Sequence, residues 1–228
     1  MALADLRTLV AAQVRDESTV IADADRDDAI ALAVVRYTED RPRSVVVDTT
    51  APGGRRLPLP AEWEDGSRIL GIETPVDQIP PAELTGEDWQ LYQGAVAQEV
   101  LLEQALDAGQ AVRWRITVAH VLDDVTDTIP LRDREAVACW ASALLLDELA
   151  AYYAGQRDTT IESDRVDWGS KSKDYAQRAK DLRKRYLDHL GIEDKRSAPA
   201  GTVVSFRDRD SRGQERLLRR YPRGGTPR

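Results

Sequence analysis

Two histidines are the only imidazoles in the chain, and one of them lies close to carboxylates. His120 is followed by Asp123, Asp124 and Asp127, residue types that could together serve general acid–base catalysis. No glycine-rich phosphate loop, nucleophile elbow or dinucleotide motif accompanies them, and His189 lies 69 residues away with no metal-ligand pattern beside it. A small enzyme built on His120 is therefore a minor alternative, and a packing role near a strand end is the favoured interpretation.

A run of aspartates near the N-terminus partly matches a calcium-binding loop. Asp23, Asp25 and Asp27 occupy its first, third and fifth ligand positions. The sixth position, a glycine in such loops, is Asp28, and the twelfth, a glutamate, is Val34. Two required features fail, so we interpret the acids as negative charge at the positive end of a helix. We expect no metal site and no cofactor.

The single cysteine, Cys139, stands next to a tryptophan in the most apolar part of the sequence. This setting predicts a buried structural thiol rather than a nucleophile. A single cysteine also excludes an internal disulfide and is typical of a reducing compartment. No apolar run approaches 18 residues, so we expect no membrane span.

Charge divides the chain unevenly. Residues 195–228 carry ten basic and three acidic residues, which leaves a net charge of −15 on residues 1–194 within the total of −8. An acidic body with a basic tail predicts that the tail contacts something acidic, although a solvated tail is the alternative. The pattern gives a body of residues 1–194 and a basic arm of residues 195–228.

A second basic region lies before the arm, on a predicted helix. Its expected subunit-facing residues are Lys171, Lys173, Arg178, Arg183, Lys184 and Arg185. Aspartates recur at seven-residue spacing along the same helix, and we expect pairs such as Asp174 with Arg178 and Asp181 with Arg185. The mixture is typical of a solvated or subunit-facing helix, and it disfavours sequence-specific DNA binding.

Hydrophobic periodicity predicts four principal helices. They span about 3–14, from 25 to the proline at 42, from 131 to Gly155, and from about 164 to Gly191. The expected core places the third helix (Trp140, Leu144, Leu145, Leu149) against the second (Ile30, Val34, Tyr37) and the last (Tyr175, Ala179, Leu182, Tyr186, Leu190).

The middle of the chain, about residues 44–121, predicts β-structure. The clearest strand is 111–121, in which apolar residues alternate with Arg113, Arg115 and Thr117, and segments 89–93 and 99–104 are expected to pair across Gly94. The predicted fold class is therefore α+β. It is a mainly helical bundle of four principal helices with one small inserted antiparallel β-sheet and an extended C-terminal arm.

Three segments resemble one family. The segment TDTIPLRDREAVACWASALLLDELAAYY (126–153), the stretch 158–192 that follows it and the opening residues 2–43 resemble the head–tail connector (adaptor) proteins of tailed bacteriophages. The resemblance lies in helix faces, turns and element order rather than in a catalytic signature. It is weakest in the middle sheet region and the final arm.

This resemblance implies a structural virion protein rather than an enzyme. Such subunits form a ring, usually of twelve copies, beneath the portal protein in the virion neck, assembled in the host cytoplasm. The ring extends the channel through which duplex DNA passes without sequence-specific binding, and it offers an attachment surface to a tail or tail-terminator protein. The subunit alone is expected to be a monomer or a weak oligomer. The alternative is a DNA-binding packaging or regulatory protein that uses the basic last helix and the tail.

The resemblance gives the basic arm a role in docking on the portal or a neighbouring subunit. The expected charged contacts are Arg207, Arg209, Arg212, Arg216, Arg219 and Arg220. Leu217, Leu218 and Tyr221 interrupt the basic run and are expected to supply apolar anchors.

Overall fold

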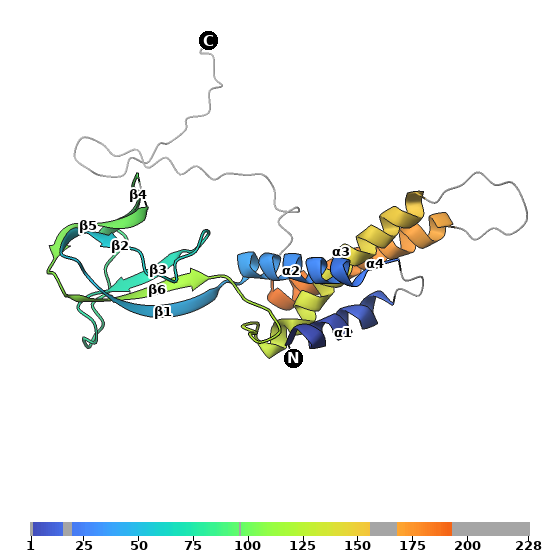
Figure 1. Ribbon diagram of the computed structural model, residues 1–228, viewed down its shortest axis with the longest axis horizontal. Helices are drawn as coiled ribbons and strands as arrows, with labels where there is room; N and C mark the ends of the chain where they lie inside the picture. Colours follow the sequence, from blue (N-terminus) through green and yellow to red (C-terminus); the bar gives the residue numbers. More distant parts are fainter. Residues whose placement is uncertain (1, 16–19, 96, 156–167, 193–228) are drawn as a thin grey trace, which may run out of the picture. The chain divides into compact units, whose positions relative to one another are not determined.

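The structure, a computed structural model, describes residues 2–15, 20–95, 97–155 and 168–192. It confirms a mixed α+β fold with four helices and antiparallel strands (Figure 1). The helices are α1 (Ala2–Val14), α2 (Asp23–Asp40), α3 (Arg134–Gly155) and α4 (Trp168–Leu190), with a 3-10 turn η1 (Leu131–Asp133) before α3. The strands are β1 (Arg43–Thr50), β2 (Gly54–Pro58), β3 (Ile69–Glu73), β4 (Trp89–Gln93), β5 (Gln98–Leu106) and β6 (Ala111–Val118). The predicted arm, 195–228, lies outside the described residues.

The ends of the helices follow from local chemistry. At the start of α2, the Asp25 carboxylate accepts the backbone N–H of Ala22 at 3.0 Å, so the acids do lie at the positive end of the helix. At the end of α4, Gly191 adopts a left-handed backbone (φ 68°). Its neighbour Ile192 donates its N–H to the Leu187 carbonyl, and this hydrogen bond closes the last turn as predicted. The expected N-cap of this helix, 163–164, lies outside the described residues.

Helix α3 is the centre of the helical part and packs against α1, α2 and α4. Leu145 and Leu149 are buried together with Ile30 and Val34, as predicted. Trp140, in contrast, is only half-buried, and so is Leu144. Trp140 lies at the edge of the core, where its ring packs against Tyr186 and contacts two guanidinium groups. No helix among the described residues is long and apolar enough to cross a membrane.

The inserted region contains two sheets, which corrects the expectation of one. Their strand orders are β1-β6-β3 and β2-β5-β4, and all the pairings are antiparallel. The chain passes from one sheet to the other at Gly53 and Gly54 (φ 97° and 89°) and at the turn around Gly109 (φ 85°). A Cβ on Gly53 would lie 3.2 Å from the Ala108 side chain, so a glycine at this position allows the two turns to approach each other closely. The pairing of β4 with β5 across Gly94 is as predicted.

The two sheets share a core of their own, separate from that of the helices. Trp114 is fully buried at its centre, and its indole N–H donates to the Thr49 hydroxyl at 2.8 Å. Strand β6 shows the predicted alternation, with Val112, Trp114 and Ile116 inward, but it ends at Val118 rather than at residue 121. The strand ends there because the residues after it turn toward α2.

Candidate functional site

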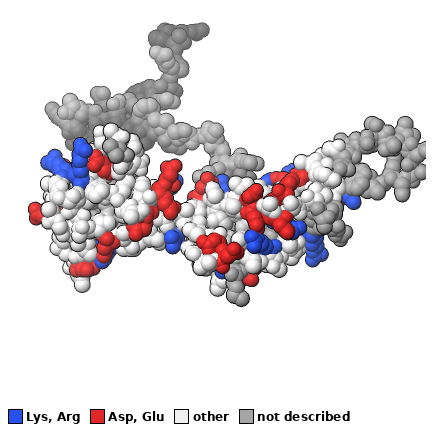
Figure 2. All heavy atoms as spheres, viewed as in Figure 1, with Lys and Arg blue, Asp and Glu red and all other residues white. Residues whose placement is uncertain are grey.

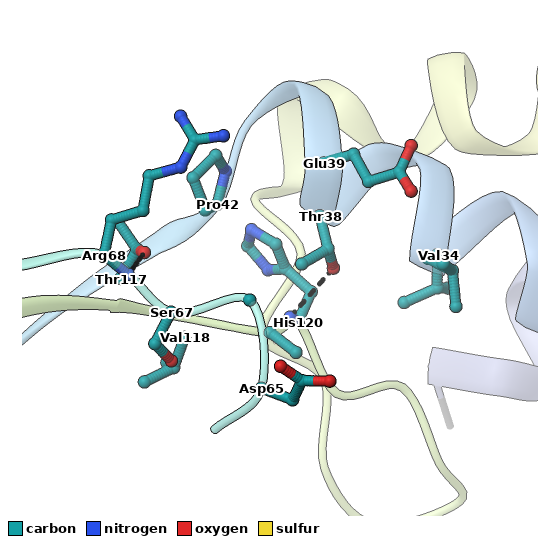
Figure 3. Close-up of a pocket in the computed structure, with 13 residues that line it drawn as sticks. Val34, Thr38, Glu39, Pro42, Asp65, Ser67, Arg68, Thr117, Val118 and His120 are labelled. Carbon is teal, nitrogen blue, oxygen red and sulfur yellow. Dashed lines mark hydrogen bonds between the residues drawn. The ribbon is translucent and has the colours of Figure 1, made fainter. Parts of the chain in front are cut away.

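A cavity of about 440 Å³ lies where α2 meets the end of β6 (Figure 3). Its walls come from the second half of α2, from the end of β6 and from the loop before β3. They are mainly apolar, with Glu39 on the helix and Asp65 on the loop as the carboxylates, and Arg68 as the cation. Such a cavity can hold a small apolar side chain of a binding partner, and its two carboxylates can pair with a cationic residue beside that side chain.

His120 lines this cavity, but its polar atoms are already engaged. The ring nitrogen Nδ1 lies 3.1 Å from both Thr128 oxygens, Nε2 lies 3.0 Å from the Arg41 carbonyl, and the backbone N–H donates to Thr38. The ring is 9 % exposed and packs against Tyr37 with centroids 4.8 Å apart. This confirms the packing role predicted for His120.

The acids that follow His120 also have local partners. Asp123 accepts the backbone N–H groups of Val125 and Thr126, and these hydrogen bonds lower the pKa of its carboxyl group. Asp127 pairs with Arg134 and accepts the N–H of Ile129. These two carboxylates order the turn before α3 and do not converge on the imidazole. Cys139 is buried as predicted, and burial raises the pKa of its thiol.

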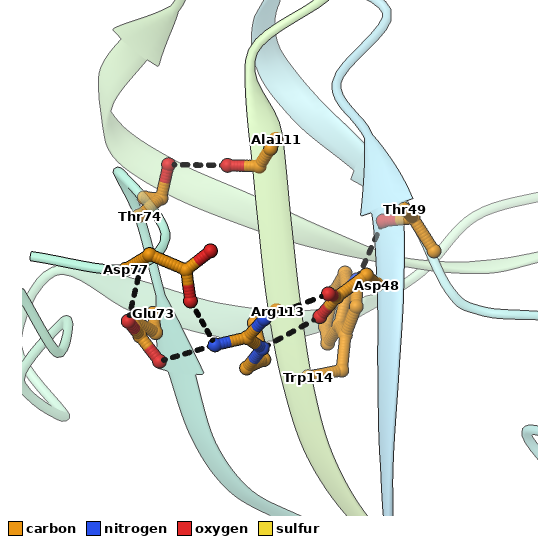
Figure 4. Close-up of polar contacts among 8 residues, drawn as sticks. All are labelled: Asp48, Thr49, Glu73, Thr74, Asp77, Ala111, Arg113 and Trp114. Carbon is orange, nitrogen blue, oxygen red and sulfur yellow. Dashed lines mark hydrogen bonds and ion pairs between the residues drawn. The ribbon is translucent and has the colours of Figure 1, made fainter. Parts of the chain in front are cut away.

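The outward face of the β1-β6-β3 sheet carries a cross-strand ion network (Figure 4). Arg113 makes two hydrogen bonds to Asp48, at 2.8 and 2.9 Å, and one to Asp77 at 2.8 Å, with Glu73 at 3.8 Å. The hydrogen bond from Arg113 lowers the pKa of Asp48. The alternation of residues along β6 predicted that Arg113 lies on the solvent-exposed face of the sheet. Only the register between β1 and β6 places Asp48 opposite Arg113.

A buried carboxylate joins three helical elements. Asp133 is 1 % exposed and accepts hydrogen bonds from Tyr37 (2.7 Å), His189 (2.9 Å) and Arg41 (3.1 Å). Burial alone would raise the pKa of Asp133, but the bonds from Tyr37 and His189 and the charge of Arg41 outweigh it and lower that pKa. Sequence reasoning missed this cluster because its members are up to 152 positions apart, with no local pattern.

The residues predicted to face a subunit on α4 divide into two groups. Lys171, Lys173, Arg178, Lys184 and Arg185 are exposed, whereas Arg183 is half-buried and pairs with Asp147 of α3. Two predicted pairings are wrong. Arg178 donates to the Gln13 carbonyl of α1 at 2.8 Å instead of reaching Asp174, and Asp181 accepts from Gln177 rather than from Arg185. The contacts of Arg178 and Asp181 therefore differ from those that the sequence spacing alone predicted.

One row of exposed side chains on α4 is basic. Lys173, Gln177, Lys180 and Lys184, which we call the α4 stripe, follow one another at four, three and four residues and therefore lie on one line of the helix. None of its three lysines forms an ion pair with another described residue.

Helix α2 presents a row of the opposite character. Asp28, Leu32, Val35 and Glu39, which we call the α2 stripe, lie on the face opposite Ile30, Val34 and Tyr37. Leu32 and Val35 are 60 % and 58 % exposed. Acidic side chains gather over the helical part in the view of Figure 2. Sequence reasoning missed this stripe, although its four-, three- and four-residue spacing was a usable signal.

The arm residues predicted to bind a partner lie outside the described residues. They are Arg207, Arg209, Arg212, Arg216, Leu217, Leu218, Arg219, Arg220 and Tyr221. No protein-family model matches the chain, and no curated protein matches it in sequence.

Proposed function

We propose that this protein is a subunit of a phage head–tail connector. In this proposal it is a non-enzymatic virion protein that assembles as a ring, docks on the portal, extends the DNA channel and gives the tail a place to attach. Its setting is the virion neck, after assembly in the host cytoplasm.

The observation that carries the proposal is where the resembling segments lie in the fold. Residues 2–43 contain α1 and α2, residues 126–153 contain most of α3, and residues 158–192 contain α4. These helices share one hydrophobic core, whereas the poorly resembling middle region has a core of its own. The resemblance therefore follows a physical unit of the molecule rather than scattered similarity.

The geometry of the titratable groups also favours a structural role. His120, Asp123, Asp127 and Asp133 are all engaged in hydrogen bonds that hold neighbouring segments together. A catalytic acid–base pair needs a side chain aimed at a substrate position. These contacts instead aim the polar atoms at backbone groups and at one another.

The alternative function is that of a DNA-binding packaging or regulatory protein that uses α4 and the basic tail. In its favour, the helix exposes five of the six basic residues singled out from the sequence. Against it, Asp174, Asp181 and Asp188 flank or follow the basic residues, so the acid-free basic surface is limited to the short row from Lys173 to Lys184, which is narrow for a duplex. A net charge of −15 on residues 1–194 adds repulsion at longer range. We therefore favour a contact with protein over a contact with duplex DNA.

Binding to portal rings, purified from the phage that encodes the chain, tests the proposal. We expect the full chain to saturate the portal as a closed ring, seen by native mass measurement, and to bind duplex DNA weakly. A variant lacking residues 200–228 should keep its melting midpoint but lose stable attachment, because the proposed arm contacts are gone. Failure of the full chain to bind that portal overturns the proposal, and tight salt-dependent binding of duplex DNA supports the alternative.

Substitutions within the arm separate its charged residues from its apolar ones. Changing Arg216, Arg219 and Arg220 to glutamate should slow association and reduce its salt dependence, because charges at the rim of an interface mainly steer encounter. Tyr221→Ala should instead speed dissociation. Arg55→Glu, on the exposed surface of the β part and outside the cavity, serves as the charge control and should change neither rate.

A further inference from the structure

We infer that the α2 stripe of one copy binds the α4 stripe of a second copy. The inference deepens the proposed function, on which it rests for ring closure, by naming the faces through which neighbouring subunits meet. Both stripes lie entirely within the residues that the structure describes.

The α2 stripe has the composition of an interface rather than of a solvated face. Leu32 and Val35 expose more than half of their surface side by side on a regular helix, with a carboxylate one turn beyond each of them. Asp28 forms no ion pair with another described residue, and Glu39 has only Arg36 at 3.6 Å. An apolar centre with charged ends is the arrangement seen at protein interfaces.

The α4 stripe supplies the complement. Lys173 and Lys184 place ammonium groups at its two ends, and Gln177 and Lys180 lie between them. The aliphatic stem of a lysine can cover apolar surface while its ammonium group stays in water. Lys180 and Gln177 can therefore cover Leu32 and Val35 without burying a charge.

The two stripes also match in length. Asp28 and Glu39 are eleven residues apart, and so are Lys173 and Lys184. At a rise of about 1.5 Å per residue, both pairs span roughly 16 Å along their helices. Two helices laid side by side can therefore form both ion pairs at once, with the apolar pair covered between them.

Neither stripe is complementary to itself. Two antiparallel α2 stripes would place Asp28 opposite Glu39, and two parallel ones would place each acid opposite its own copy. Two α4 stripes would oppose lysines in either direction. Like charges opposed across a contact are unfavourable, so each stripe favours the other stripe of a second copy over its own counterpart. In a ring, each subunit would use its α2 stripe toward one neighbour and its α4 stripe toward the other, which is a head-to-tail contact. A head-to-tail contact repeats from copy to copy and closes into a ring if its rotation allows.

Pairwise cross-linking of the full chain tests the contact. A Val35→Cys variant is mixed at about 100 µM with an isotope-labelled Lys180→Cys variant and oxidised, both in the presence of the buried Cys139. We expect a mixed disulfide dimer, identified by mass, at least fivefold above either variant alone. The pair Gln90→Cys and Lys180→Cys is the control, because Gln90 is exposed on β4, outside both stripes. A yield equal to the control overturns the inference, and so does self-coupling of Val35→Cys at the same yield.

Charge exchange gives an independent readout that does not need a disulfide. The double variants Asp28→Lys/Glu39→Lys and Lys173→Glu/Lys184→Glu should each lower self-association at least fivefold in sedimentation equilibrium, with unchanged melting midpoints. Mixing the two should restore association, because each exchanged stripe then meets its complement. Absence of rescue contradicts the inference.

The two proposals fail separately. If the cross-link and the rescue occur but the chain does not bind the portal, the stripes form the contact and the connector function is wrong. If rings form on the portal while both experiments fail, the function stands and the lateral contact lies elsewhere.

Discussion

The β1-β6-β3 sheet and the two helical stripes differ in how their exposed charged side chains are paired. On the β1-β6-β3 sheet, Arg113 is held by three acids, and Arg115 pairs with Glu83 at 2.8 Å. On the helical part, Asp28 and the lysines of the α4 stripe form no ion pair with any described residue. Charges satisfied within a fold hold its strands in register, whereas unpaired ones remain available to another molecule. The proposed contact between copies uses the unpaired charges of the two helical stripes and leaves the paired charges of the sheet in place.

The interiors differ as well. The core of the β part is built around one tryptophan, Trp114, whereas the helical core is spread over alanines and leucines along α3. The helical core also contains a hydrogen-bonded carboxylate, Asp133, where the β core uses a neutral pair, Trp114 with Thr49. Among the described residues, the two parts share no buried core residue, so some substitutions should affect one part and spare the other.

The largest effect is expected in the β core. Trp114→Ala removes the largest fully buried side chain and should cost about 3–5 kcal/mol of unfolding free energy. Because the helical core is separate, helical circular dichroism at 222 nm should persist through a first, lower transition in which the backbone amides of the β-strands lose their protection from hydrogen exchange. A single transition that removes both signals together would show that the two cores unfold as one unit.

The corresponding change in the helical core should be slightly smaller. Leu145→Ala leaves a cavity in the core that α3 forms with the other helices and should cost about 2–5 kcal/mol, measured by urea denaturation followed at 222 nm. The half-buried Leu144→Ala is the matched control on the same helix and should cost less. A loss below about 0.5 kcal/mol at Leu145 would show that this position is not in the core.

The third effect depends on pH. Asp133→Asn removes the negative charge that Tyr37, His189 and Arg41 share, and should cost about 2 kcal/mol at pH 7. The pKa of Asp133 is lowered in the folded protein, so its charge stabilises the fold above the ordinary value of 3.8, and that stability is lost as the pH falls through the folded pKa. The difference between wild type and variant should therefore narrow below pH 3.8. A constant difference from pH 7 to pH 2 would contradict this role.

The smallest effect is expected on the sheet surface. Arg113→Met removes the exposed ion network but keeps the aliphatic stem, so the melting midpoint should fall by no more than about 2 °C in 0.15 M salt. The double variant Arg113→Met/Asp48→Asn should differ little from the single one. A fall of 10 °C or more would mean that the network holds the two sheets together rather than only the register of three strands.

The local sequence pattern was enough to predict the helices and the clearest strands. The stripe of α3, the alternation of β6, the pairing across Gly94 and the glycine at the end of α4 were all predictable, since each depends on residues within a turn or two of one another. The packing role of His120 and the burial of Cys139 were also predicted correctly, because both follow from the apolar or strand-end segments that contain them.

The contacts between those elements depend on packing between distant segments. Periodicity could not show that the strands form two sheets, because that division depends on how the turns at Gly53 and Gly109 redirect the chain. The donors to Asp133 come from two distant segments, the end of α2 and the end of α4, and the partner of Arg178 is a carbonyl on α1. The exposure of Leu32 and Val35 likewise depends on which side of α2 receives α3. Local spacing specifies which residues share a face, whereas packing between distant segments determines which face stays open to a partner.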